Sequence, residues 1–423
     1  MQTLLVFVGV LVVMLALGVP IFISLGVGAI SIWLMSMGEL QPALVLQKMF
    51  IGVDNFTLMA IPLFILTGEL MNFGGVSRRL IDFAQSLVGW IRGGLGFVVV
   101  VTCMFLAAIL GSSSACSAMV GAVLIPAMVS AGYDEDFSGG LVAASGGIGP
   151  LIPPSTPMLL YAVAASQSVS DLFLAGYVPG ILVAILFMVY TYIVARKRHY
   201  PAGEKPTVKS FFSSLRRALI PLCLPVIIMG GILSGVFTAT ESAVAAVIYC
   251  LIVGLFVYKE ITFRDLPKVF LRAAKSTAMM LIVVATASFL SYAMTIAQIP
   301  QTVTKLITSV TSNPTIFLLL VNAVLIVAGM FLDAGCAIII LTPVFLPAVK
   351  ALGIDQVFFG VMMTVNLMVG VLTPPVGMNL FVTSSISGIN ILRLSKAVMP
   401  FIYILCGVIL LMVLFPGMVT FML

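Results

Sequence analysis

The stretch GGIGPLIPPSTP, residues 146–157, interrupts a segment that is otherwise apolar enough to cross a bilayer. Pro153 and Pro154 lack a backbone N–H, and each disfavours the helical conformation in the residue before it. A helix therefore cannot run through this stretch, and the carbonyl groups around it need another donor or a cation. In a membrane, such a break is tolerated only where it is buried in protein or lines a cavity.

A second break of the same kind lies in VGVLTPPVG, residues 369–377, which contains Pro374 and Pro375. Shifting the sequence against itself by 221 residues (374 − 153) superposes the two Pro-Pro pairs. The same shift also superposes Pro126 on Pro347, Gly132 on Gly353, Asp134 on Asp355, Phe137 on Phe358, Gly139 on Gly360, Gly149 on Gly370 and Pro179 on Pro400. We interpret the chain as an internal duplication whose paired breaks indicate a transporter binding site near the membrane midplane.

The composition predicts an all-α polytopic membrane protein. Of the 423 residues, 62% are hydrophobic and 8% are charged, whereas a soluble domain carries about 25% charged residues. A transmembrane barrel would show alternating segments of about ten residues, but continuous apolar runs of about 20 residues dominate here.

The sequence of each half predicts five membrane crossings and one re-entrant helical hairpin. The whole chain is therefore predicted to have about ten spans and two hairpins in an elevator-type architecture. Each hairpin joins two apolar runs of about 15 residues, only ~23 Å of helix against a hydrocarbon core of ~30 Å. Because five is odd, the second half is inverted in the membrane. The predicted units are a first repeat, 1–195, with hairpin 95–130 and broken helix 138–166; a linker, 196–217; and a second repeat, 218–423, with hairpin 315–349 and broken helix 357–387.

The distribution of basic residues gives an independent test of this inverted topology. If the linker 196–217 is cytoplasmic and both termini are outside, then all of the 20 Lys and Arg residues except Lys48, Lys305 and Lys350 lie inside. This agrees with the positive-inside rule. The net charge of +6 is therefore explained by topology rather than by nucleic-acid binding.

The cysteines and the single histidine argue against a membrane-embedded enzyme. All six cysteines lie in apolar runs, where cysteine acts as a small hydrophobe, so we expect neither a disulfide nor a transition-metal site. His199 lies in the basic linker, which removes a Ser-His dyad or a zinc site from the membrane interior. A channel would need polar seams along several full spans, and none is evident.

The two hairpin tips carry the chemistry that an ion-coupled transporter needs. Residues 111–114 read Gly-Ser-Ser-Ser, and the second tip is Asp333 to Gly335. Hydroxyls, a carboxylate and unpaired carbonyls are ligands for a hard monovalent cation, while half-helix N-termini suit a carboxylate substrate. Two structural alternatives stay open. Small residues also serve helix packing, and Asp333 could be hydrated at the interface.

Other acidic and basic segments favour structural roles. Glu69 is interpreted mainly as an interfacial or helix–helix contact, and Glu241 as a residue of a helix start capped by Thr238. The three consecutive acidic residues 134–136 are interpreted as a solvated turn. The linker 196–217 predicts either an interfacial helix or a loose basic loop.

Five motifs together make the chain closely resemble the large membrane subunit of tripartite ATP-independent periplasmic (TRAP) transporters, of the DctM/SiaM type. They are IPLFILTGELM at 61–71, IPAMVSAGYD at 125–134, GPLIPPS at 149–155, FTATES at 237–242 and LTPPVGMNLF at 372–381. The resemblance covers essentially the whole chain. It implies a sodium-coupled importer of organic acids, such as sialic acid or C4-dicarboxylates, in the bacterial inner membrane.

The same resemblance implies partners, an elevator-like motion and a set of site residues. The partners are a small membrane subunit and a periplasmic substrate-binding protein. The implied substrate contacts are Ser155, Thr156 and Asn379. The implied sodium ligands are Ser112, Ser113 and Ser114 with Gly146, Gly149 and Pro150, and Asp333 with Gly370, Thr373 and Gly377.

A self-sufficient sodium–carboxylate symporter is the alternative. The longest outside connections, residues 38–56 and 298–314, are too short for a capture domain of the ~50 residues that a small domain needs. We therefore expect the chain to transport poorly from dilute solution without its partners.

Overall fold

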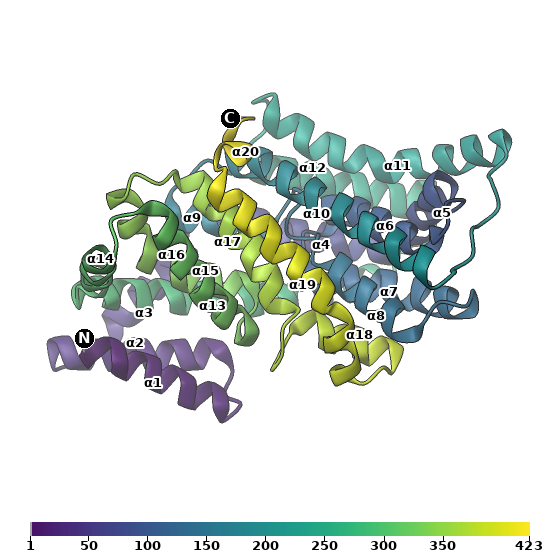
Figure 1. Cartoon of the computed structure of the whole chain (residues 1–423). Coiled ribbons are helices and arrows are strands. Elements are labelled where there is room, and N and C mark those ends of the chain that lie inside the picture. Colours follow the sequence, from purple (N-terminus) through teal and green to yellow (C-terminus); the bar gives the residue numbers. More distant parts are fainter. Residues whose placement is uncertain (1) are drawn as a thin grey trace.

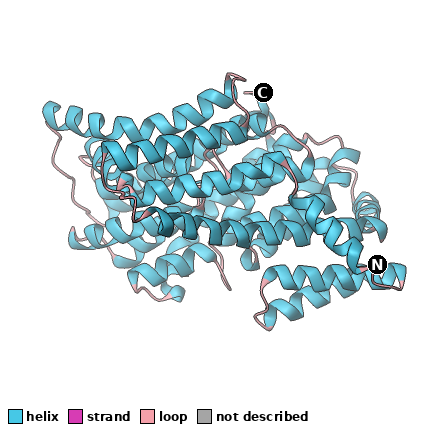
Figure 2. Cartoon of the chain, turned by 180° about the vertical axis from the view of Figure 1, so that it is seen from behind, coloured by secondary structure: helices cyan, strands magenta, loops and turns pink. Residues whose placement is uncertain are grey.

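The computed structural model describes residues 2–423, apart from the side chains of residues 4 and 308–310. Within that part of the chain there is no β-strand, and the single isolated bridge joins Arg92 to Ala202. The predicted all-α class is confirmed. Figure 1 shows the N-terminus and the connection between helices α10 and α11 at opposite ends of the molecule, and the reverse view in Figure 2 agrees.

The first half of the chain forms the helices α1 Gln2–Ala16, α2 Ile21–Met37, α3 Pro42–Val53, the 3-10 helix η1 Phe56–Met59, α4 Ala60–Phe73, α5 Val76–Val88, α6 Gly94–Leu110, α7 Ser113–Ser130, α8 Glu135–Gly146, α9 Thr156–Ala165 and α10 Val169–Lys197. The second half forms α11 Val208–Leu233, α12 Ala239–Ile252, the π-helix η2 Val253–Val257, α13 Leu266–Ile296, α14 Ile299–Val310, α15 Pro314–Phe331, α16 Ala334–Ala351, α17 Gln356–Val371, α18 Met378–Ser387, α19 Ile391–Leu414 and α20 Gly417–Thr420.

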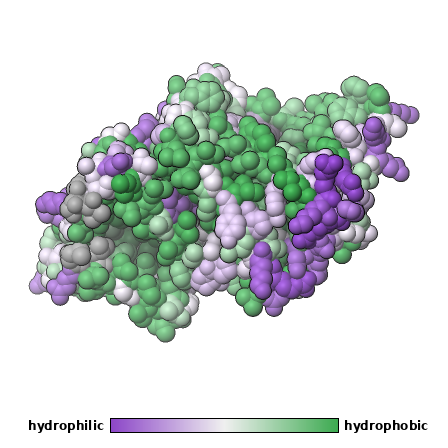
Figure 3. Space-filling model, viewed as in Figure 1, coloured by the Kyte–Doolittle hydropathy of each residue, from purple (hydrophilic) through white to green (hydrophobic). Residues whose placement is uncertain are grey.

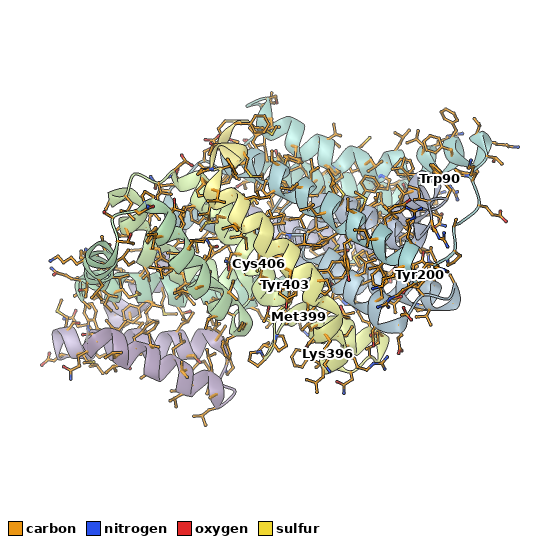
Figure 4. The ribbon with its side chains drawn as sticks, in the orientation of Figure 1. Trp90, Tyr200, Lys396, Met399, Tyr403 and Cys406 are labelled. Atoms are coloured by element: carbon orange, nitrogen blue, oxygen red, sulfur yellow. The ribbon has the colours of Figure 1, made fainter. Side chains whose placement is uncertain are left out.

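Among the described residues, nine helices are long and apolar enough to cross a membrane, so the chain is a multi-pass membrane protein. Apolar side chains cover much of the face in Figure 3, and hydrophilic ones gather toward the end that carries the α10–α11 connection. Lys396, Met399, Tyr403 and Cys406 follow one another along the outward side of α19 in Figure 4. Tyr403 is 68% exposed, as expected for a side chain that faces lipid.

The arms of the two helical hairpins are longer than the sequence predicted. Helices α6 and α7 have 17 and 18 residues, and α15 and α16 have 18 each, against the expected 15 or so. Helices α7, α15 and α16 qualify by length and composition as spans. The length argument for re-entry therefore no longer holds, and the re-entrant placement of these hairpins stays a prediction.

Both Pro-Pro stretches separate two helices. Residues 147–155 lie between α8 and α9, residues 372–377 lie between α17 and α18, and both Pro-Pro peptide bonds are cis. Helix α9 begins where Ser155 caps it, accepting a hydrogen bond from Met158 N at 3.3 Å, with Pro157 in the first turn. Gly377, before α18, has φ of +54°, a left-handed conformation that favours glycine.

Segments from the two halves of the chain pack against each other around these breaks. Helix α9 packs against α16, and α18 packs against α7, so each short helix after a break lies on the hairpin from the other half. Helices α2 and α3 pack on the long helix α13 at the edge of the molecule. Both hairpin tips and the ends of the two breaks thereby lie close together.

Three surface helices, α3, α5 and α14, were not predicted. Helix α5 is amphipathic, with Leu80, Phe83 and Ala84 buried, and it packs between α6 and α11. The expected linker is also partly helical. Its residues 208–217 form the start of α11, and Phe211 of this segment lies 6.2 Å from Phe83 between ring centroids. The linker is therefore neither a separate interfacial helix nor a loose loop throughout.

The structure bears on two of the predicted structural roles, the helix start at Thr238 and the acidic turn at 134–136. The helix start at Thr238 and Glu241 is confirmed, because the Thr238 side chain and the Glu241 carboxylate form a reciprocal capping box. The acidic residues 134–136 do not form a free solvated turn. Asp134 precedes α8 and pairs with Arg198, while Glu135 and Asp136 lie in the first turn of α8 and pair with Arg393.

Candidate transport site

A cavity of about 880 Å³ lies between the two hairpin tips. Its lining includes residues 111–114 of the first tip and 333–336 of the second, with apolar walls from residues such as Leu160, Met280 and Ile339. The cavity has the size of a small-molecule site and is mostly apolar with a few polar groups, which is typical of ligand pockets.

Four helices begin at this cavity. Ser113, Thr156, Ala334 and Met378 are the first residues of α7, α9, α16 and α18, and all four line the cavity. The N-terminal end of a helix carries a partial positive charge and free backbone N–H groups. The cavity wall is therefore suited to an anionic group.

The first hairpin tip lies directly on the first helix break. Gly111 has φ of +58°, and a Cβ atom built on it would lie 2.6 Å from the Pro154 carbonyl oxygen. A Cβ atom on Gly149 would lie 2.9 Å from the Ser112 carbonyl oxygen. The Ser112 and Ser114 hydroxyl oxygens are 3.3 Å apart. Backbone contacts this close leave no room for a side chain at either glycine.

The second tip presents Asp333 at the start of α16. One carboxylate oxygen, Oδ2, accepts a hydrogen bond from the backbone N–H of Gly335 at 3.1 Å, so Asp333 is the N-cap of this helix. Asp333 is also one of the residues that line the cavity. It can therefore serve both as a helix cap and as an oxygen ligand for a cation.

The residues predicted as site residues divide into three groups. Ser112, Ser113, Ser114, Pro150, Thr156 and Asp333 line the cavity. Gly146 and Gly149 lie behind the first tip, since a Cβ atom on Gly146 would be 1.9 Å from the Ser117 hydroxyl oxygen. Ser155, Gly370, Thr373, Gly377 and Asn379 are not among the residues that line it.

The last group has contacts of its own. Gly370 lies against Gly329, where a Cβ atom would come within 2.4 Å of the Gly329 Cα, and the Thr373 hydroxyl donates to the Val369 carbonyl at 2.7 Å. The Ser155 hydroxyl donates to the Pro150 carbonyl at 2.5 Å. Asn379 is completely buried, and its Nδ2 donates to the Ala143 carbonyl at 3.2 Å.

The sequence interpretation missed part of the cavity wall. Asn72 of α4 and Ser276 of α13 line it, as does Glu69, which had been interpreted mainly as a helix contact. Glu69 Oε2 is buried without a hydrogen-bond partner. The sequence did contain a signal for Glu69, because an ionisable residue within an apolar helix is usually functional. Asn72 and Ser276 gave no such signal, because nothing in their local sequence places them near a hairpin tip.

Similarity to known proteins extends over almost the whole chain. Residues 8–418 match the family described as "Tripartite ATP-independent periplasmic transporter, DctM component". The C4-dicarboxylate TRAP transporter large permease protein DctM of Pseudomonas aeruginosa is 44% identical over 383 residues, which cover 90% of this chain and 89% of that protein. The sialic acid TRAP transporter large permease protein SiaM of Vibrio cholerae is 40% identical, covering 88% and 87%.

Two other similarities bear on architecture. The isethionate TRAP transporter permease protein DctMQ of Oleidesulfovibrio alaskensis is 40% identical over 98% of this chain but only 65% of its own length. The YdaH transporter of Alcanivorax borkumensis has a similar fold, with a TM-score of 0.65, 16% sequence identity and 98% coverage of both chains. On the family match and these identities, the chain belongs to the DctM family of TRAP transporter large permeases.

Proposed function

We propose that this protein is the transport subunit of a sodium-driven importer of small organic anions. The observation that carries the proposal is the convergence of four helix N-termini and of both hairpin tips on one cavity. The N–H groups at the helix starts suit the anionic group of the substrate, and the apolar walls suit its carbon skeleton.

The substrates named for relatives share one chemical feature. C4-dicarboxylates, sialic acid and isethionate all carry a carboxylate or a sulfonate at neutral pH. Arginine and lysine are not among the residues that line the cavity. Backbone N–H groups would therefore bind the anion, with Thr156 and the Ser112–Ser114 hydroxyls as additional donors.

Sodium ions would bind beside the substrate, at the oxygen atoms of the two tips. The Ser112 to Ser114 hydroxyls with the carbonyls of Gly146, Gly149 and Pro150 form the first proposed set. Asp333 with the backbone of the second break, at Gly370, Thr373 and Gly377, forms the other. A sodium ion that moves inward down ~100 mV provides about 2.3 kcal/mol before any concentration gradient.

The proposal includes two partners. A small membrane subunit and a periplasmic binding protein would supply a scaffold surface and substrate capture, while the hairpin domains move like an elevator. The DctMQ relative supports the first partner, because about a third of it lies outside the match to this chain, as in a fusion with a second subunit. The protein would lie in the inner membrane as an inverted repeat, with periplasmic termini and a cytoplasmic linker.

Reconstitution in liposomes tests this function. Uptake of radiolabelled succinate, sialic acid and isethionate is measured with an inward sodium gradient for the chain by itself, with the small subunit, and with both partners. Sodium-dependent uptake of one of these anions only with both partners is the expected result. Full-rate uptake by the isolated chain at micromolar substrate would favour a self-sufficient symporter, and uptake that does not respond to sodium would overturn the proposed coupling.

A further inference from the structure

A second cavity, of about 430 Å³, adjoins the cavity between the hairpin tips, which we call the transport cavity. Asn72 of α4 and Ala118 and Met119 of α7 line both cavities. From these residues the second cavity extends to the start of α5, where Ser77 and Arg78 line it. The shared residues therefore place the second cavity directly beside the transport cavity.

The second cavity keeps a positive charge. Its acidic residue, Glu260, pairs with Arg79 at 2.5 Å, and the Arg79 guanidinium also lies over the Tyr258 ring, 3.7 Å from the ring centroid. Its basic residue, Arg78, is exposed and forms no hydrogen bond or ion pair within the part of the chain that the structure describes. The acid is thus neutralised and the base is not, whereas the lining of the transport cavity contains neither arginine nor lysine.

A second arginine lies beside the junction of the two cavities. The Arg272 guanidinium lies over the ring of Phe73, 4.9 Å from its centroid, and Phe73 directly follows Asn72 in α4. Arg272 precedes Ser276 by one turn of α13, and Ser276 lines the transport cavity. Arg272 also acts electrostatically on the carboxylate of Glu69, another wall residue, although the described residues include no ion-pair partner for it. The side chain therefore lies close to the cavity wall with its charge available.

Both arginines belong to the side of the protein proposed as cytoplasmic. Helix α5, which carries Arg78, lies at the same end of the molecule as the α10–α11 connection (Figure 1). Arg272 lies in the second turn of α13, near the helix start that this topology places inside. An anion that leaves the transport cavity past Asn72 toward this side would meet both guanidinium groups.

We propose that Arg78 and Arg272 form a transient binding site for the anionic group of the substrate on its way from the transport cavity to the cytoplasm. The inference rests on the proposed function and adds a second, weaker anion site to it. Neutral N–H groups would hold the anion in the transport cavity, so positive charge further along the route favours its departure. The guanidinium groups are exposed and hydrated, and they would attract a passing anion without holding it tightly.

The charge selectivity of a single cysteine at Ala118 tests this site, because Ala118 lies where the two cavities meet. The background lacks the native cysteines, including Cys336, which lines the transport cavity. The measured quantity is the ratio of the rates at which an anionic sulfonate and a cationic trimethylammonium methanethiosulfonate modify the purified protein, so that changes in steric access cancel. We expect Arg78→Gln and Arg272→Gln each to lower this ratio by about threefold, and the double variant by about tenfold.

Two further variants control for effects other than charge at this place. Arg78→Lys keeps the charge and should keep the ratio. Arg216→Gln removes an exposed arginine that lines neither cavity and has no ion-pair partner among the described residues, so it should leave the ratio unchanged. An unchanged ratio in Arg78→Gln and Arg272→Gln would overturn the inference.

Uptake by liposomes that contain both partners tests the role in release. The double glutamine variant should lower the maximal uptake rate by about threefold or more and leave the sodium midpoint unchanged, because the arginines act after sodium and substrate have bound. Size-exclusion chromatography checks that the variant is folded. A variant with a lowered thiol ratio but an unchanged maximal rate would place the arginines off the release route and overturn the proposal. The proposed function fails separately, when the unmodified protein shows no sodium-dependent uptake with both partners.

Discussion

Gly111 and Pro154 hold the first hairpin tip against the first helix break. A Cβ atom on Gly111 would lie 2.6 Å from the Pro154 carbonyl oxygen and 3.3 Å from the Thr156 backbone N. The contact joins the serine-containing tip of the α6–α7 hairpin to the helix break that leads into the first turn of α9. The geometry of the cavity wall at this point therefore depends on the absence of a single side chain.

Gly111→Ala is expected to abolish transport while the protein still inserts in the membrane. Alanine at a positive φ costs about 1–2 kcal/mol, and the added methyl group would also push the tip away from the break. The measurement is uptake in liposomes, with the amount of folded protein read from size-exclusion chromatography.

Gly132→Ala separates these two effects. Gly132 has φ of +87°, but nothing lies within 4 Å of the position of its Cβ atom. It therefore carries the conformational cost without the crowding. Equal loss of transport in both variants would contradict the role of the Gly111–Pro154 contact.

Asp333→Asn is expected to raise the sodium concentration for half-maximal uptake by about tenfold or more. Asparagine is as good an N-cap as aspartate, so this variant removes the charge but keeps the cap of α16. Asp355→Asn is the control, because Asp355 caps α17 in the same way, with Phe358 N at 2.7 Å, but does not line the cavity. An unchanged sodium response of Asp333→Asn would remove Asp333 from the proposed ligands.

The sequence predicted the parts of the fold that depend on local chemistry. The stretches that contain Pro153 and Pro374 can be recognised because proline prevents helix wherever it occurs in a long apolar run. The capping box at Thr238 can also be recognised from four residues. The spans and the two tips followed from the apolar runs and the small or polar residues between them, whereas site residues such as Pro150 and Thr156 were proposed only from the family resemblance.

The missed features depend on packing between distant segments. Helix α5 has too many polar residues to be read as a span, and its buried face becomes visible only against α6 and α11. Ser276 lines the cavity because α13 passes the second tip, and Asn379 lies away from the cavity because α18 turns that side chain toward α8. No local pattern in the sequence encodes these directions.

Topology can be tested with single cysteines at Ser210 and Leu423, in a background without the exposed Cys223. Most basic residues lie on the same side of the membrane as the 196–217 linker, so we expect that side to be cytoplasmic. An impermeant thiol reagent should therefore label position 423 but not position 210 in intact cells. Permeabilised cells, in which both positions should react, provide the control. Labelling of position 210 from outside would contradict the proposed orientation.

The last prediction concerns Asp134, which joins the start of α8 to the end of α10. Its carboxylate accepts hydrogen bonds from Tyr200 and Arg198. Both bonds lower the pKa of Asp134 below its usual value, and the bond from Tyr200 has the larger effect. A carboxyl group with a lowered pKa stabilises the folded state when it is ionised, so its contribution is complete well above pH ~4 and is lost as the pH falls through the folded-state pKa. Asp134→Asn should therefore lower the melting temperature at pH 7 and lower it by less at pH 3 to 4. The change at pH 7 should be small, because the Asp134–Arg198 pair is about half exposed and screened by solvent. Asp265→Asn is the comparison, because the Thr262 backbone N–H and hydroxyl hold the Asp265 carboxylate at a helix start, and Asp265 forms no ion pair with arginine within the described residues. If Asp134→Asn shifted the melting temperature equally at both pH values, the ionised carboxylate would not be the source of the stabilisation.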